Sequence, residues 1–168
     1  MEKFEFSVIA SGVDHEADDF EDRFFEAGCD DATIGFSRGS VILHFAREAA
    51  SLNDAIQSAI ENVRAAGAHV DRIEPDHLVS LSEIAARSGL TRAAATNYAK
   101  GERGKGFPHP VARVTSESPL WDWVQVAEWL ADRGKLRARE VEAARVVRDH
   151  NLALEAPAPR ADAARRFA

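Results

Sequence analysis

Hydrophobic and polar residues alternate at the start of the chain, in the pattern of a strand. The alternating apolar positions are Phe4, Phe6, Val8 and Ala10. A period of two residues is typical of a strand with one buried face, and this pattern ends at Gly12. Phenylalanines then recur at helical spacing over residues 15–27. A helix that starts at Asp14 and ends at Gly28 is therefore predicted.

A hairpin, a helix and a last strand follow. Apolar runs at 32–36 and 41–45 flank a Ser-Arg-Gly-Ser turn sequence, which predicts a hairpin. Ser51 indicates the N-cap of a helix that ends at Gly67, and a short strand is predicted at 70–73. The order strand, helix, strand, strand, helix, strand is that of the ferredoxin-like fold, with both helices on one face of an antiparallel sheet.

From residue 78 the pattern changes to short helices separated by glycines. The predicted helices are 82–88, 91–100, 121–131 and 136–151, with a glycine-rich loop and a short hairpin over 101–119. The expected fold class is α+β, with a ferredoxin-like βαββαβ domain followed by a mainly α domain. The predicted ranges are 1–76 and 77–134 for these two domains, 135–154 for a C-terminal helix and 155–168 for a disordered tail.

Charge divides the chain at the same place as the hydrophobic pattern. The 28 acidic and 21 basic residues give a net charge of -7, but residues 1–77 carry 17 of the acidic and 6 of the basic residues. The first part is therefore at -11 and the remainder at +4, which indicates different partners for the two parts. Within 87–113, six basic residues stand against one acidic residue, Glu102. This window is a candidate surface for a polyanion.

The strongest functional motif spans residues 78–104 and has the spacing of a helix-turn-helix. Ala85 supplies a small residue where the two helices cross, and Gly89 supplies the positive φ of the turn. Thr91 can cap the second helix through its hydroxyl. The apolar residues expected to hold the helices together are Ile84, Leu90, Ala95 and Tyr98.

The second helix leaves a set of DNA-compatible side chains on its exposed face. They are Arg92, Ala93, Thr96, Asn97 and Lys100. These residue types bond to guanine, adenine or phosphate, or contact the thymine methyl group. A structural helical hairpin with a solvated face has the same spacing and remains an alternative.

Residues 101–114 form a basic loop that leads through a Phe-Pro-His-Pro sequence toward Trp121, which opens the next predicted helix. Over about residues 78–133 the chain resembles the winged helix-turn-helix domains of the MerR and excisionase (AlpA-like) superfamily. The resemblance implies that the helix 91–100 enters the major groove and that a wing over 101–115 touches the backbone or the minor groove. It implies base readers at Arg92, Thr96 and Asn97, and phosphate or groove contacts at Lys100, Arg103, Lys105 and Arg113. The long coiled-coil arm of MerR proteins has no counterpart after the wing, so metal or drug sensing is not implied.

Other candidate chemistry in the sequence is weak. Trp121, Trp123 and Trp129 have a spacing that favours core packing over base stacking. The acidic residues around His15 and Cys29 lack the spacing of a calcium or zinc site, and no cofactor motif or catalytic motif is present. We therefore expect no enzyme activity, no metal and no cofactor. A single cysteine and the lack of a long apolar stretch suggest a cytoplasmic protein without a membrane partner.

Together these patterns predict a bacterial, sequence-specific binder of double-stranded DNA. We expect a transcriptional regulator, one that could control its own operon, and a homodimer, because a single winged helix buries little DNA surface. One alternative is an antitoxin or phage-type accessory protein whose acidic N-terminal domain holds a protein partner. Another is a metal-dependent nuclease built on the ferredoxin-like domain, with Asp14 as its candidate acidic residue.

Overall fold

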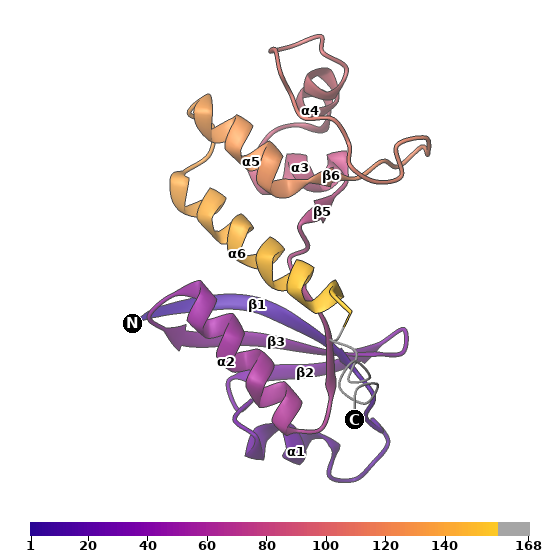
Figure 1. Ribbon diagram of the computed structural model, residues 1–168, viewed down its shortest axis with the longest axis vertical. Helices are drawn as coiled ribbons and strands as arrows, with labels where there is room; N and C mark the ends of the chain where they lie inside the picture. Colours follow the sequence, from indigo (N-terminus) through magenta and orange to yellow (C-terminus); the bar gives the residue numbers. More distant parts are fainter. Residues whose placement is uncertain (158–168) are drawn as a thin grey trace, which may run out of the picture. The chain divides into compact units, whose positions relative to one another are not determined.

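The computed structural model describes residues 1–157, and the chain divides into two compact units (Figure 1). Within the described residues, one unit comprises Met1–Ile73 together with residues 149–157, and the other is Glu74–Arg148. We call them the sheet unit and the helical unit. None of the helices within residues 1–157 is long and apolar enough to cross a bilayer.

The sheet unit contains its elements in the predicted order. They are β1 (Glu2–Ser11), α1 (Phe20–Glu26), β2 (Ala32–Ser37), β3 (Ser40–Ala49), α2 (Leu52–Ala65) and β4 (His69–Glu74). The four strands form an antiparallel sheet in the order β2-β3-β1-β4. The predicted hairpin is confirmed, because Arg38 and Gly39 have φ values of 51° and 83° between the paired residues Ser37 and Ser40. Positive φ at both turn residues matches the right-handed twist of the flanking strands.

The core of the sheet unit lies between the sheet and its helices. The inward side chains of β1 at Phe6, Val8 and Ala10 are buried, as their alternation predicts. Phe6 stacks on Phe45 of β3 with the ring centroids 5.5 Å apart. The helix α2 packs on β1 and β3 (Figure 1), and Ser51 caps it by accepting a hydrogen bond from the Asp54 amide, as predicted.

The helix α1 is shorter than predicted. The helix does not begin at Asp14, since residues 15–19 form turns and α1 starts only at Phe20. The Asp14 carboxylate accepts a hydrogen bond of 3.0 Å from the Glu16 amide, a local side-chain bond that competes with helix formation. Near its end, Arg23 donates to the carbonyl of Ala66, which follows α2. The two helices are therefore neighbours.

The helical unit contains short helices and one small pair of strands. Its elements are β5 (Leu78–Val79), α3 (Leu81–Ser88), α4 (Arg92–Ala99), β6 (Trp121–Asp122), α5 (Trp123–Asp132) and the larger part of α6 (Ala138–Glu155). The predicted helix 121–131 starts two residues late, because Trp121 and Asp122 pair with β5. The Asp122 carboxylate then caps α5 by accepting from the Val124 amide at 2.8 Å.

The last helix and the chain end also depart from the prediction. The helix α6 begins at Ala138 rather than at residue 136 and continues to Glu155, and the two units divide it after Arg148. Residue 155, placed in the disordered tail from sequence, is therefore helical. The rest of that predicted tail from residue 158 onward lies outside the described residues.

The core of the helical unit gathers residues from all its helices. Ile84, Ala85 and Ala95 are buried where α3 meets α4, as predicted. Trp121 and Trp123 are 4% and 7% exposed, so the prediction that they serve the core is confirmed. Trp129 is partly buried against the same cluster, and its indole N–H also bonds to the loop that follows α4.

Candidate nucleic-acid interface

The turn between α3 and α4 follows the local chemistry of its residues. Ser80 and Glu83 form a reciprocal capping box at the start of α3, a signal in the sequence that the prediction missed. Gly89 ends α3 with a φ of 71°, and the Thr91 hydroxyl accepts from the Ala94 amide at 3.1 Å, both as predicted. The start of α4 is thus fixed by two adjacent local features.

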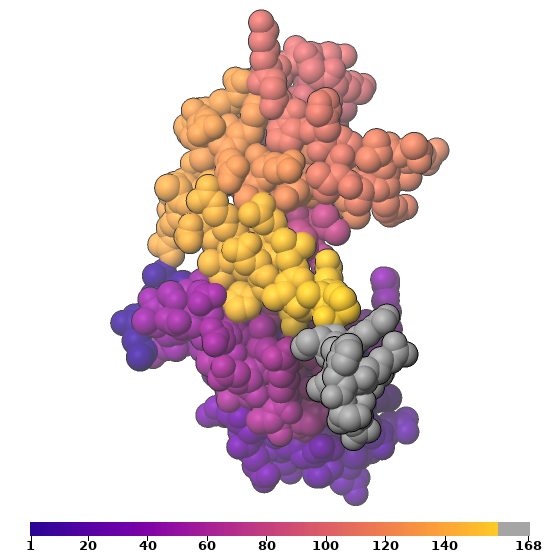
Figure 2. All heavy atoms as spheres, in the orientation of Figure 1, coloured from indigo at the N-terminus to yellow at the C-terminus, as the bar shows by residue number. Residues whose placement is uncertain are grey.

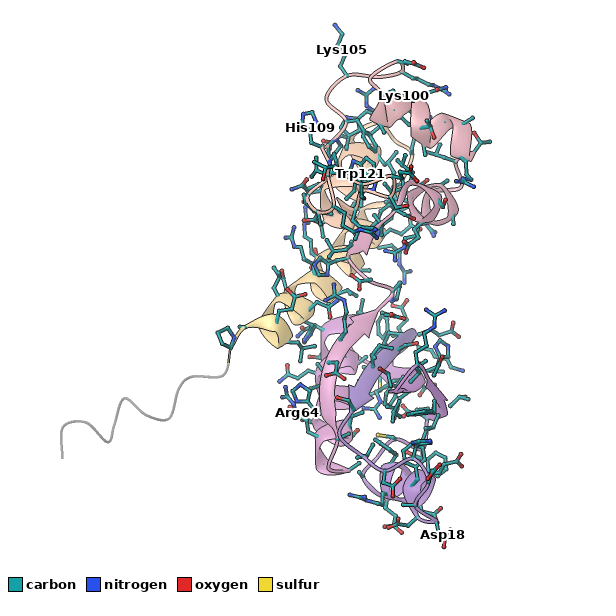
Figure 3. All side chains as sticks on the ribbon, turned by 90° about the vertical axis from the view of Figure 1, so that its right-hand side faces the viewer. Asp18, Arg64, Lys100, Lys105, His109 and Trp121 are labelled. Atoms are coloured by element: carbon teal, nitrogen blue, oxygen red, sulfur yellow. The ribbon has the colours of Figure 1, made fainter. Side chains whose placement is uncertain are left out.

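One face of α4, together with its C-cap residue Lys100, carries five of the predicted DNA-contacting residues. We call this surface the α4 face. Arg92, Ala93 and Lys100 are exposed, and Thr96 and Asn97 are half-buried. Their side chains make no hydrogen bond or ion pair with any residue of the described chain. Figure 3 shows the Lys100 side chain at the surface of its unit. The polar groups of this face are therefore available to a ligand.

The loop 101–106 follows α4, and aromatic side chains anchor it. Trp129 lies between Tyr98 and Phe107, with ring centroids 5.0 Å and 5.2 Å away and both rings edge-on to the indole. The Trp129 indole N–H donates to the Lys105 carbonyl at 3.1 Å, and Arg133 donates to the same carbonyl at 2.8 Å. The loop backbone is therefore attached to α5.

The side chains of Arg103 and Lys105 make no hydrogen bond or ion pair in the described chain, while the backbone of the loop is held. Lys105 points away from its unit in Figure 3, and the loop projects from the surface in Figure 2. The Arg103 guanidinium lies over the Tyr98 ring, 5.5 Å from the centroid, which places it beside the end of α4. Two basic side chains thus adjoin the α4 face on an anchored loop.

The predicted wing 101–115 is divided in the structure between two separate loops. No regular strand forms between Phe107 and Leu120, where Pro108 and Pro110 lack the N–H that a ladder requires. The second loop is closed by an isolated bridge between Ala112 and Leu120, and the Val111 amide also donates to the Leu120 carbonyl. Arg113 lies on this second loop with a φ of 52°, apart from the loop that carries Arg103 and Lys105.

Two arginines near the interface show where reasoning from sequence was incomplete. Arg87 belongs to the basic window, but its guanidinium donates to the Asp76 carbonyl at 2.7 Å and lies over the Trp123 ring. Burial also lowers the pKa of Arg87. Because its contacts lie within the unit, this cation serves the fold. Arg133 was not predicted, although it follows α5 four residues after Trp129, a spacing that brings the two side chains together.

Residues outside this interface offer little further chemistry. Within residues 1–157, no three His, Cys, Asp or Glu side chains lie close enough together to hold a metal ion. Asp14, the candidate acidic residue of a nuclease, is exposed and bonded to the Glu16 amide. Comparison of the chain with protein-family models, curated proteins and solved structures found no match. The functional interpretation therefore rests on the geometry of α4 and its loop.

Proposed function

We propose that the helical unit is a winged helix-turn-helix domain that binds double-stranded DNA, and that the protein is a transcriptional regulator. One observation carries the proposal. The exposed face of α4 presents polar and cationic side chains without partners in the described chain, beside a loop whose backbone is anchored and whose cations make no hydrogen bond or ion pair there. A helix that is capped, exposed and basic has the properties required for entry into a major groove.

The residue types on α4 suggest a division of roles. Arg92 bonds to the guanine edge and Asn97 to the adenine edge, while Thr96 and Ala93 contact bases through a hydroxyl and a methyl group. Lys100, Arg103 and Lys105 neutralise phosphates and set the register of the helix. Arg113, on the second loop, contacts the backbone or the minor groove. Sequence preference then comes from α4 and most of the salt dependence from the loops.

The sheet unit has a different task in this proposal. Its strand order, β2-β3-β1-β4, supports its assignment to the ferredoxin-like class. With a net charge of -11 over residues 1–77, DNA repels it. It therefore serves association with another protein or a second copy, and a dimer doubles the DNA surface that one winged helix contacts.

The test is selection of a preferred site from a pool of random duplexes, followed by fluorescence anisotropy of the full chain over a salt series. Arg92→Ala and Asn97→Ala should each cost about 1–3 kcal/mol on the selected site and little on scrambled DNA. Lys105→Ala should weaken both complexes and lower the salt slope by about one. Arg139→Ala on α6 removes an exposed arginine from another surface of the helical unit and is the matched control.

Three results would contradict the proposal. No duplex enriched by selection would mean that α4 does not read sequence. Equal losses on both DNAs for all of these variants would reduce the interaction to general charge attraction. Shortening of the DNA in the presence of magnesium would favour the nuclease alternative.

A further inference from the structure

The two outer strands of the sheet, β2 and β4, differ in what covers their edges. On β4, the Ile73 amide donates to the Asn151 side-chain oxygen at 2.7 Å, and the Ile73 carbonyl accepts from the Asn151 amide nitrogen at 3.0 Å. The Asn151 carboxamide thus takes the place that a neighbouring strand would take, and it is fully buried. This edge is closed at Ile73.

The edge of β2 is open. The two-residue turn makes Ser37 and Ser40 a hydrogen-bonded pair, and pairs alternate along an antiparallel ladder. The N–H and C=O groups of Ile34 and Phe36 therefore point away from β3, and within the described chain no residue outside the sheet bonds to them. The strand contains no charged residue and no proline, the features with which proteins block exposed edges.

Opposite charges stand at the two ends of this open edge. Asp30 lies just before β2 and Arg38 just after it, and both are exposed without an ion pair in the described chain. In an antiparallel pairing of β2 with itself, Ile34 lies opposite Ile34 of the second copy. Asp30 lies in the turn before β2 and Arg38 in the turn after it, so this pairing brings the Asp30 turn of each copy beside the Arg38 turn of the other, where two symmetric ion pairs can form. The charges that flank the strand thus fit a second copy of this chain.

We propose that the protein forms a homodimer by antiparallel pairing of the β2 edges, which joins the two sheets into one continuous sheet. This interface lies in the sheet unit and does not depend on DNA binding. The pairing is isologous, because each residue meets its symmetry counterpart across a two-fold axis. It keeps outward-pointing groups opposite each other, since Ile34 and Phe36 fall in hydrogen-bonding positions. At Ala32 only the carbonyl is available, because the Ala32 N–H donates to the Cys29 carbonyl at 3.1 Å.

A mixed-cysteine experiment tests the register. Thr33 lies opposite Gly35 of the second copy in a non-hydrogen-bonded pair, where Cα atoms are about 4.5 Å apart, close enough for a disulfide. Full-length Thr33→Cys and Gly35→Cys chains should therefore form a cross-linked dimer when they are refolded together and oxidised. Either variant alone should stay uncross-linked, because identical positions are offset by two residues. A Cβ at Gly35 meets no atom within 4 Å, so its substitution leaves the strand undisturbed.

The native cysteine does not interfere with this experiment. Cys29 is fully buried, and burial raises the pKa of its thiol to about 11. It therefore stays protonated at the pH of the oxidation, and the thiolate is the reactive form. Unmodified protein, oxidised in parallel, should give no cross-linked dimer.

Sedimentation velocity over a concentration series tests the dimer and its ion pairs. The unmodified chain should sediment as a dimer at micromolar concentration. Arg38→Asp or Asp30→Arg alone should raise the dissociation constant about threefold to tenfold, because each brings two pairs of like charges together. Combining Asp30→Arg with Arg38→Asp should restore the original value. Aspartate tolerates the positive φ at position 38.

Three outcomes would overturn the proposal. A monomer at every concentration would exclude self-association. A dimer without the mixed cross-link would place the interface on another surface, and a dimer insensitive to both charge reversals would do the same. DNA binding is measured separately by anisotropy, so these failures are distinguishable from failure of the proposed function.

Discussion

Two arginines, one from each unit, show opposite uses of this side chain. In the sheet unit, Arg47 is only 8% exposed and all of its guanidinium nitrogens donate hydrogen bonds. Its partners are both carboxylate oxygens of Asp31 at 2.8 and 2.9 Å, Ser58 at 3.0 Å, Asn62 at 2.9 Å and the Gly28 carbonyl at 2.7 Å. In the helical unit, Arg92 is exposed and has no such partner in the described chain.

This difference shows that counting charges does not locate a ligand site. Arg47 lies in the more acidic part of the chain, yet its charge is satisfied within the fold and attracts nothing from outside. The basic window contains both kinds, because Arg87 is held by the Asp76 carbonyl while Arg92 is free. A cation indicates a polyanion surface only where the fold leaves its donors unbonded.

Replacing Arg47 by methionine should have the largest effect on stability. The change leaves Asp31 without its ion-pair partner and leaves the Gly28 carbonyl and the Asn62 side chain without their donor. Breaking a buried pair on one side costs about 3–5 kcal/mol, and we expect the lower end because Asp31 is 32% exposed. Urea unfolding measures the loss.

Arg64→Met is the matched control, because Arg64 lies exposed on α2 and the same side chain is exchanged (Figure 3). Its effect should stay within about 0.5 kcal/mol. Equal losses for the two variants would show that the Arg47 contacts contribute nothing beyond ordinary packing. The contrast between internally bonded and free arginines would then have no counterpart in the free energy of unfolding.

The features that sequence predicted correctly depend on residues close together in the chain. The hairpin turn at Arg38 and Gly39, the cap at Ser51 and the positive φ of Gly89 are each decided within about four residues. The alternation in β1 likewise reports the local period of a strand. Such signals fixed most elements of both units and the exposed face of α4.

The features that sequence did not predict depend on distant partners. The pairing of Leu78–Val79 with Trp121–Asp122 shortened a predicted helix, and the Trp129 bond to Lys105 holds the first loop of the predicted wing on α5. The contacts of Arg47 reach α2 and the turn after α1, which no local window contains. Asp14 was a local failure, because a side-chain turn and a helix cap have similar sequence signals.

Asn151→Leu should have the second largest effect. Asn151 is fully buried and satisfies both backbone groups of Ile73, so a leucine of similar volume leaves a donor and an acceptor buried without partners. We expect a loss of about 2–3 kcal/mol in the free energy of unfolding. Hydrogen exchange should show faster exchange at the Ile73 amide.

This variant extends the comparison from charged to uncharged polar groups of the sheet unit. Leu152→Asn, at the neighbouring exposed position of α6, places the same side chain where it meets solvent and should change little. An unchanged unfolding curve for Asn151→Leu would mean that water satisfies Ile73 equally well. The hydrogen bonds of Asn151 at the edge of β4 would then contribute nothing to the free energy of unfolding.

Gly104→Ala tests whether the backbone of the loop is held in the helical unit. Gly104 has a φ of 73°, and a Cβ there would lie 3.1 Å from the Trp129 ring. Gly101 has a φ of 75° with nothing within 4 Å, so Gly101→Ala pays only for the backbone conformation. We expect about 1 kcal/mol for Gly101→Ala and about 2 kcal/mol for Gly104→Ala. Only the second should also change the tryptophan fluorescence, since it displaces the indole.

The smallest effect concerns the pH dependence of the sheet unit. Burial lowers the pKa of His150, whose imidazole nitrogen lies 2.9 Å from the Asn53 side-chain oxygen. The neutral ring is thus favoured in the folded state, and the unfolded state binds more protons just below the ordinary histidine pKa of about 6.5. Stability from this residue is fully present above that pH and is lost as the pH falls below it. The urea midpoint measured across this window should decline, and His150→Gln should reduce the decline.

The window separates His150 from the many carboxylates of the same unit. Asp and Glu titrate near pH 4 in the unfolded chain, so their contribution appears mainly below pH 5. His109→Gln, in an exposed position of the helical unit, makes the same substitution without altering the sheet unit and should leave the decline unchanged. If the decline persists in His150→Gln, a different group titrates on unfolding. The contact between His150 and Asn53 would then not belong to the internal polar contacts that stabilise the sheet unit and that the α4 face lacks.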